Sequence, residues 1–484
     1  MKTSVTISKL DILRSHMSFN LPLGYDSRKK DELFLALNKN AFSYFQLNDN
    51  AEKANYYGEG ITVDGKELEQ YFLPYIERKI FPTSLKENGF HRFTKSIQER
   101  FIYRVRDTSL PFIIHSIDIV VAPFSLAFLS IRVQLDNEEL DLSDVLDFMH
   151  HFRTIDQKLE EERGMTISSP IYGDGLSIHE LLFVHLCPFL TDFLLHDKNL
   201  NGYFGSLPYY EDERMYASAF LFSREDSKIT EDQLYRMGAL DGRSPDGKPF
   251  ISAKNPEYIH RSLGNSLHDR WAPDTYTIAT EHAFITVTNH LSVDMSRELS
   301  QYMGTHYYNF LLHYFYKVML LQVSFNYSEI NWKKDEEYVK SLIKLITLFT
   351  SWYYFQEIST RSEGKELSKR FRQSFAIDSL FKEVNKTLQE LYKSQENNAS
   401  DRMNMLLLIL TVFTVVSGIY GMNLVIEDWA SPSGWKALST YTIFEWISLV
   451  TALSGIALSV YLTFTTIGKT VLGKLRQKKS NTHQ

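Results

Sequence analysis

The residues with the clearest chemical meaning lie near the C-terminus, where Gly421, Met422 and Asn423 follow a long uncharged run. An amide oxygen such as that of Asn423 can accept hydrogen bonds from the water shell of a cation without trapping the cation as a carboxylate would. Gly421 has no side chain, so its backbone can approach an axis or a neighbouring helix closely. These residue types therefore suit contact with a hydrated metal ion, with Asn423 acting through the hydrating water.

Five residues before this motif recur at steps of three to four and can share one helical face. They are Met403, Leu407, Thr411, Thr414 and Gly418. Met403 and Leu407 could form a hydrophobic constriction that gates by dewetting, and the two threonines could line the same path. The alternative is that Thr411 and Thr414 bond only to the backbone of their own helix.

Two stretches of the C-terminal part carry no charged side chain, Met403–Ile426 and Trp446–Gly468. A helix needs about 20 apolar residues to cross a bilayer core of roughly 30 Å. The pattern therefore predicts transmembrane helices over 403–426 and 445–468, joined by an external loop over 427–444. The alternative is a helical hairpin that only anchors a cytosolic domain.

Basic residues near the two stretches predict the orientation of the chain, because loops rich in Lys and Arg stay in the cytoplasm. The flanking basic residues are Lys386, Lys393, Arg402, Lys469, Lys474, Arg476, Lys478 and Lys479. The loop has only Lys436, so we expect an inner-membrane protein with both termini and a basic tail (469–484) in the cytoplasm. Glu427 and Asp428 could attract cations to the loop, or could be ordinary solvated charges.

The string SGIYGMN, from Ser417 to Asn423, at the end of the first of two C-terminal spans resembles the CorA family of divalent-cation channels. The resemblance implies a funnel-shaped homopentamer in which Gly421, Met422 and Asn423 form the entry filter for hydrated magnesium. It also implies transport without an enzymatic reaction, with no cofactor except magnesium as transported and regulatory ion. The loop reads LVIEDWASPSGW where the family commonly has an MPEL-like string, which leaves the ion preference open.

Residues 1–330 are expected to form a cytosolic α/β regulatory domain, because strand-like and helical patterns mix there. The strand-like segments are Phe112–Val121, Ser125–Gln134, Tyr216–Phe222, Tyr276–Thr280 and Phe284–Thr288, with a hairpin formed by the last two. The helical segments are Asp141–Lys158 and Val293–Val323. Three other apolar stretches, Ile119–Ile131, Met303–Phe325 and Leu345–Phe355, are predicted to be buried core or subunit contacts rather than spans.

From about Asp335 the pattern is helical, with apolar residues such as Ile377, Phe381 and Val384 at steps of three and four. The stretch from Lys365 to Tyr420 predicts one nearly continuous helix, and residues 331–402 are expected to form a stalk. In CorA-like proteins such a stalk carries conformational change from the cytosolic domain to the pore. The alternative is an ordinary helical hairpin with a break at Gln395–Ser400.

Composition and spacing exclude several other kinds of protein. The net charge of −7 argues against nucleic acid as a direct partner, and the single Cys187 excludes an intrachain disulfide. His179 and His185 are six positions apart, so they cannot share a helical face as zinc-protease histidines do. The adjacent His150 and His151 should point different ways on a helix and are interpreted as structural.

Three functions stay open at this point. The first is a CorA-like homopentameric channel that conducts hydrated divalent cations, with magnesium as the expected ion, under the control of residues 1–330. The second is a CorA-like membrane effector of a type III CRISPR antiviral system, opened by a nucleotide messenger. The third is a membrane-anchored sensor with a non-conducting hairpin. The sequence assigns no residue of 1–330 to a regulatory ligand.

Overall fold

The computed structural model describes most of residues 5–427 and a few positions beyond them. The described residues are 5–46, 61, 63–137, 139–157, 164–195, 207, 209–210, 213–290, 295–330, 336–427, 442–444, 446–447, 449–450, 453–454 and 457. The chain divides into two compact units, Met1–Leu388 and Gln389–Gln484.

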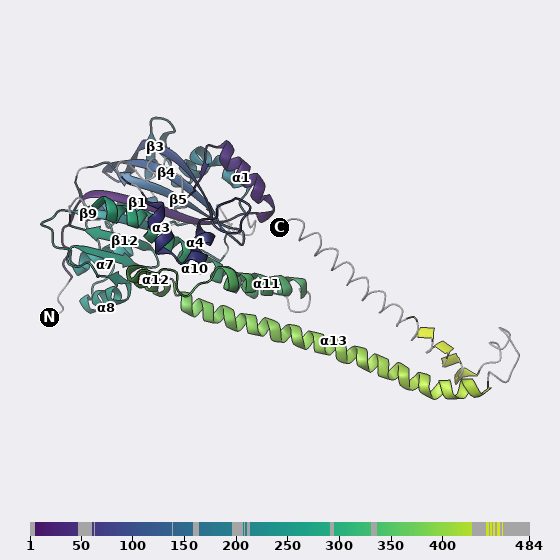
Figure 1. The fold of residues 1–484 in the computed structure, drawn as a ribbon. Coiled ribbons are helices and arrows are strands. Elements are labelled where there is room, and N and C mark those ends of the chain that lie inside the picture. The colour runs from purple at the N-terminus through teal and green to yellow at the C-terminus, as the bar shows by residue number, and fades with distance from the viewer. Residues whose placement is uncertain are drawn as a thin grey trace. The chain divides into compact units, whose positions relative to one another are not determined.

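All described strands of the first unit join in one 12-stranded sheet (Figure 1). They are β1 (Asp11–Gly24), β2 (Ser43–Tyr44), β3 (His91–Val105), β4 (Thr108–Val121), β5 (Leu126–Leu135), β6 (Leu140–Asp141), β7 (Thr166–Ser169), β8 (Gly173–Leu176), β9 (Tyr216–Ser223), β10 (Leu267–His268), β11 (Thr275–Ala279) and β12 (Ala283–Thr288). The order is β10-β11-β12-β9-β1-β5-β4-β3-β7-β8, with β2 beside β3 and β6 beside β1. The β9–β12 pair is parallel and the other described pairs are antiparallel, so the sheet is mixed.

Along the chain, some of the described helices lie between strands and others follow the last strand, β12. They are α1 (Lys30–Lys39), α3 (Gly65–Tyr71), α4 (Pro74–Ile80), α5 (Leu142–Phe152), α6 (Ile178–Glu180), α7 (Glu231–Ala239), α8 (Pro256–Ser266), α9 (Met295–Gln301), α10 (Tyr307–Ser328), α11 (Glu336–Trp352), α12 (Ser362–Ser374) and α13 (Ile377–Glu427). Short 3-10 turns form η1 (Ser27–Lys29) and η4 (Pro188–Asp192), and π-helical turns form η3 (Leu181–Leu186) and η5 (Tyr302–His306).

Both faces of the sheet are covered, which explains why its central strands are apolar on both sides. On one face Phe19 of β1 packs against Phe152 of α5, with ring centroids 4.6 Å apart. Ile131 of β5 belongs to the same core. On the other face Phe128 of β5 contacts Tyr314 of α10 at 5.6 Å. The sheet is therefore the central layer between α5 on one side and α10 on the other.

The five predicted strands and the β11–β12 hairpin are confirmed. The predicted helix 141–158 ends early at Phe152, because the chain then pairs with the segment before β9, where Ile155 donates its N–H to the Glu213 carbonyl. The predicted helix 293–323 is interrupted by the π-helical turn η5. The apolar stretches 119–131 and 303–325 are buried, as predicted, and α11 buries Ile346 and Phe349.

The predicted continuous helix from Lys365 to Tyr420 is two helices. α12 and α13 are separated at Phe375–Ala376, where Ala376 has a φ of +52°, which an α-helix does not accommodate. Beyond this joint α13 runs for 51 residues, about 75 Å at 1.5 Å per residue. It passes through residues 395–400 without interruption, so the alternative with a break there is wrong.

The prediction of two transmembrane helices is wrong for the part of the chain that the structure describes. No described helix is both long and apolar enough to cross a membrane. In α13 two charged residues, Asp401 and Arg402, come directly before the apolar run that starts at Met403.

The predicted architecture and the predicted location in the cell both depended on those spans. The funnel-shaped architecture with two C-terminal spans and the multi-pass inner-membrane location with cytoplasmic termini are corrected with them. The second predicted span (445–468) lies outside the described residues except at a few positions. The tail (469–484) lies outside them entirely.

Candidate functional site

The residues predicted from the C-terminal motif all fall on or after α13. Gly421–Asn423 lie in its last turns, where the side chains are outside the described part. Thr411 and Thr414 donate their hydroxyls to the carbonyl oxygens of Leu407 and Leu410, over 2.7 and 2.8 Å. This is the intrahelical bonding that the sequence offered as the alternative to pore lining.

Most of the other residues predicted from the C-terminal motif also lie on α13. Met403 and Leu407 are 58% and 52% exposed, and Gly418 lies one to two turns beyond the threonines. Glu427 is the last residue of α13, and Asp428 lies outside the described residues. Residues along one face of a single helix cannot surround an ion by themselves, so this helix alone is not a binding site.

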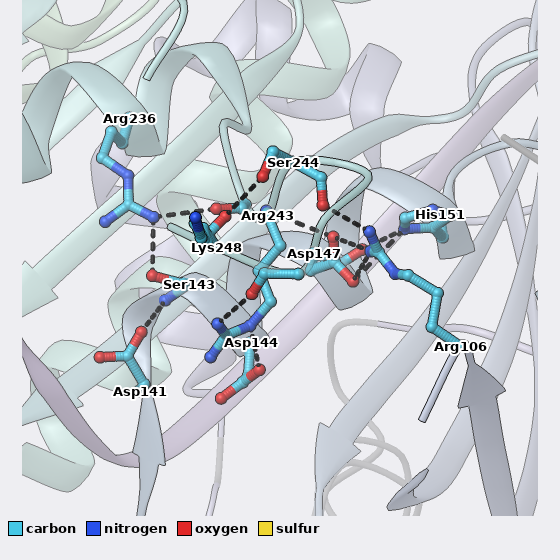
Figure 2. Close-up of polar contacts among 12 residues, drawn as sticks. Arg106, Asp141, Ser143, Asp144, Asp147, His151, Arg236, Arg243, Ser244 and Lys248 are labelled. Carbon is cyan, nitrogen blue, oxygen red and sulfur yellow. Dashed lines mark hydrogen bonds and ion pairs between the residues drawn. The ribbon is translucent and has the colours of Figure 1, made fainter. Parts of the chain in front are cut away.

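Polar side chains gather instead around α5 in the first unit (Figure 2). The helix begins after Asp141, whose carboxylate accepts the N–H of Ser143 over 2.8 Å and so caps the first turn. Asp144, Asp147 and His151 then follow at steps of three and four, which places them on one face. Two pockets lie beside this helix, one along that face and one at its C-terminal end.

The first pocket, which we call the paired pocket, has a volume of about 440 Å³ and is lined by Arg106, Asp147, His150, His151 and Arg243 among others. Arg106 Nη2 donates to both carboxylate oxygens of Asp147, at 2.9 and 2.8 Å. Arg243 Nε donates to Asp144 over 2.6 Å. Both arginines of this pocket are therefore matched to carboxylates of α5.

The loop that carries Arg243 is held closely to α5. Arg236, which is 1% exposed, donates to Ser143 Oγ at 2.8 Å and to the Gly242 carbonyl at 3.0 Å. A Cβ atom on Gly242 would lie 2.3 Å from the backbone nitrogen of Asp147, so only glycine permits this approach. The polar groups of the paired pocket thus fasten the loop to the helix.

The second pocket, the basic pocket, has a volume of about 230 Å³ and combines cationic groups with tyrosines. Its described lining residues are Arg153, Tyr209, Tyr210, Arg214, Met215, Tyr216, Glu281, His282, Lys317 and Leu321. Arg153 follows α5, Arg214 precedes β9 and Lys317 lies on α10. Three cations thus face one carboxylate, that of Glu281, among the described lining residues.

Backbone pairing places two of the cations side by side. Thr154 and Arg214 form an isolated antiparallel bridge, and Met215 donates its N–H to the Arg153 carbonyl over 2.8 Å. Arg153 Nη1 also lies 3.5 Å from the carbonyl oxygen of His282, in the turn between β11 and β12. The pocket is therefore assembled from segments that are far apart in the sequence.

Cationic residues of this pocket contribute to the lowered pKa values of two histidines, His282 and His150. Partial burial lowers the pKa of His282, and the charges of Arg153, Lys317 and Arg214 lower it further, against the opposing effect of Glu281. Burial, with the charges of His151, Arg153, Arg214 and Arg106, lowers the pKa of His150 to about 3. Both imidazoles are neutral at pH 7, and an anion would find a positive environment.

Tyrosine rings form the walls of the basic pocket. Tyr216 stacks on Phe310 with centroids 4.7 Å apart and donates its hydroxyl to the Thr280 carbonyl over 2.9 Å. The hydroxyls of Tyr210 and Tyr314 lie 2.9 Å apart. Aromatic walls beside cations can hold a planar ring that is attached to an anionic group.

Sequence reasoning missed both pockets. His150 and His151, which the sequence suggests are structural, both line the paired pocket, and His151 Nδ1 lies 2.8 Å from the Asp147 carbonyl oxygen of the same helix. A local signal for the basic pocket is the short string from Tyr209 to Arg214, which has two tyrosines, three acidic residues and an arginine. Among the residues with described positions, no group of three His, Cys, Asp or Glu could hold a metal ion.

Comparison of the chain with protein-family models, with curated proteins and with solved structures gives no match. The function has to be argued from the site itself.

Proposed function

We propose that residues 1–388 form a ligand-sensing domain whose basic pocket binds a phosphorylated small molecule of the nucleotide class. The observation that carries this proposal is the convergence of Arg153, Arg214 and Lys317 from three separate elements. Phosphate oxygens form strong, charge-assisted hydrogen bonds with such groups. The tyrosine walls are suited to a base or another planar ring.

Among the described lining residues, the basic pocket carries more positive charge than the paired pocket, and this difference supports placing an anion there. A phosphate in the basic pocket would meet three cations and one carboxylate among the described lining residues. In the paired pocket, an anion would have to displace Asp147 from Arg106 or Asp144 from Arg243, and those ion pairs are 2.8 and 2.6 Å long. Breaking them would cancel most of the gain from binding.

The basic pocket is also in contact with the joint between α12 and α13. The ammonium of Lys317 lies 5.4 Å from the ring centroid of Phe375, and the Tyr216 ring lies 5.5 Å from the same ring. Phe375 is 1% exposed and precedes Ala376, the residue with positive φ. A phosphate that draws Lys317 toward itself would weaken its cation–π contact with Phe375, so occupancy could be sensed at the start of α13.

The functions implied by the CorA resemblance stay predictions. These are conduction of magnesium past Asn423, assembly as a pentamer and a role in antiviral defence. The described contacts do not bear on them.

The proposal is tested by calorimetry of the full chain with AMP and with pyrophosphate. We expect saturable binding of at least one probe, and an affinity lower by about tenfold or more in Lys317→Met, because a charged hydrogen bond contributes about 1.5–3 kcal/mol. Lys340→Met is the matched control, because Lys340 is exposed on α11, and its ion pairs among the described residues are with Glu336 and Glu337 of the same helix. Absence of heat with both probes, or equal affinity in Lys317→Met, would refute the proposal.

A further inference from the structure

A separate cavity of about 380 Å³ lies over β11 and β12, on the sheet face that α9, η5 and α12 cover. We call it the threonine pocket and define it by Thr277, Thr286, Gln301, His306 and Glu363, with Trp271 among its lining residues. It shares no lining residue with the basic pocket. Its volume is within the range of small-molecule sites, roughly 300–1,000 Å³.

The floor of this pocket consists of paired hydroxyl groups. Thr277 Oγ1 lies 2.8 Å from Thr286 Oγ1, and Thr275 Oγ1 lies 2.8 Å from Thr288 Oγ1. In a pair of hydroxyls only one proton is shared, so the accepting hydroxyl keeps its own proton for another partner. The Thr277–Thr286 pair can therefore both donate to and accept from a ligand hydroxyl.

Several polar and charged groups of the walls have partners of their own. Gln301 Nε2 and Arg361 Nη1 donate to the same oxygen of Glu67, over 2.6 and 3.1 Å. His306 Nε2 lies 3.1 Å from Glu363 Oε1. The described charged lining residues are two arginines and two glutamates, Arg297, Arg361, Glu298 and Glu363. Unlike the basic pocket, this lining favours neither an anion nor a cation.

Trp271 adds an apolar surface to this polar lining. Its side chain is 51% exposed, and the guanidinium of Arg270 lies 5.3 Å from the ring centroid. An indole ring next to hydroxyl, amide and imidazole groups offers a flat face for the C–H side of a sugar or for a base. The polar groups then remain available for the hydroxyls of the same ligand.

We propose that the threonine pocket binds a small, uncharged, hydroxyl-rich ligand, a sugar or a nucleoside. The ring of the ligand lies against Trp271, and its hydroxyls exchange hydrogen bonds with the Thr277–Thr286 pair, Gln301 and the His306–Glu363 pair. This inference stands on residues that the proposed phosphate site does not use. The two sites can therefore fail independently.

The test is calorimetry of the full chain with adenosine and with D-glucose, together with tryptophan fluorescence. We expect saturable heat with at least one probe, and an affinity lower by about fivefold or more in Thr277→Val, which removes one hydroxyl without changing side-chain volume. Trp271→Ala, a change at a half-exposed position, should weaken binding about tenfold and abolish the fluorescence change. Thr191→Val, at an exposed position of η4, is the matched control.

The outcomes distinguish a nucleoside from a sugar as the ligand, and the threonine pocket from the basic pocket as the binding site. Binding of adenosine alone indicates a nucleoside, and binding of both probes indicates recognition through sugar hydroxyls; both support the proposal. Binding must also persist in Lys317→Met, because loss there would place the probe in the basic pocket and overturn the inference. No saturable heat with either probe up to about 10 mM, or unchanged affinity in both Thr277→Val and Trp271→Ala, would also overturn it.

Discussion

The paired pocket and the basic pocket lie beside the same helix and both contain arginines. The charged residues around these arginines differ between the two pockets. In the paired pocket Arg106 and Arg243 are each matched to a carboxylate of α5, and their hydrogen bonds fasten the loop after α7 to the helix. In the basic pocket Arg153 and Arg214 stand beside Lys317 with one lining carboxylate. The described linings of the two pockets therefore differ in their balance of charge rather than in residue type, and this difference underlies the proposal of an anion site in the basic pocket.

The largest effect is expected from Gly242→Ala, at the position in the paired pocket where the loop backbone comes closest to α5. In Gly242→Ala the new Cβ would lie 2.3 Å from the nitrogen and 2.5 Å from the Cα of Asp147, so the loop has to move away from α5. We expect the free energy of unfolding to fall by about 3 kcal/mol. Urea unfolding followed by circular dichroism measures this change.

Gly264→Ala on α8 is the matched control, since no atom lies within 4 Å of its Cβ position. It should be neutral or stabilising by up to about 1 kcal/mol, because alanine is the better helix former. If Gly242→Ala were no more destabilising than this control, the loop would not be fastened to α5 as described.

A smaller effect is expected from Asp147→Asn, which keeps the shape of the side chain but removes its charge. The bidentate bond from Arg106 is lost, while Arg106 remains about one-third exposed and keeps part of its hydration. We therefore expect a loss of about 2 kcal/mol in unfolding free energy, less than for a fully buried pair. The exposed Asp246→Asn should change it by less than about 0.5 kcal/mol, and equal effects of the two variants would contradict the role of Asp147.

The smallest effect at neutral pH concerns His150, whose pKa is lowered by burial and by charged residues of both pockets. Its pKa is about 3 in the folded chain against 6.5 as its ordinary value, so between these pH values the unfolded chain binds a proton that the folded chain does not. Stability should therefore fall as the pH drops below about 6.5, by about 1.4 kcal/mol per pH unit for this one group.

His150→Gln removes this contribution, so its unfolding free energy should depend less steeply on pH between about 6.5 and 3. Urea unfolding at a series of pH values measures the slope. His260→Gln provides the control, because the His260 side chain is 78% exposed. Parallel pH profiles of wild type and His150→Gln would show that the two pockets do not hold this imidazole neutral.

Local patterns predicted five of the twelve strands but not the long strands β1 and β3, the joint or the pockets. The strands at Phe112–Val121 and Phe284–Thr288 were predictable because runs of β-branched and aromatic residues suit a buried strand. The joint at Ala376 was missed because neither proline nor glycine marks it. The transmembrane prediction is wrong for the residues that the structure describes, because a lack of charge in a sequence stretch does not establish a helix that is long and apolar enough to span a bilayer.

The sequence by itself determined which apolar stretches are buried, where five of the twelve strands run and that no intrachain disulfide can form. These properties depend on local periodicity and composition, which the backbone geometry of each element translates directly into buried and exposed faces. The tertiary structure alone decided which charges meet. Arg153, Arg214 and Lys317 share a pocket because strand order and the bridge at Thr154 bring three distant segments together. No spacing along the chain encodes such a meeting, since it depends on how the elements pack.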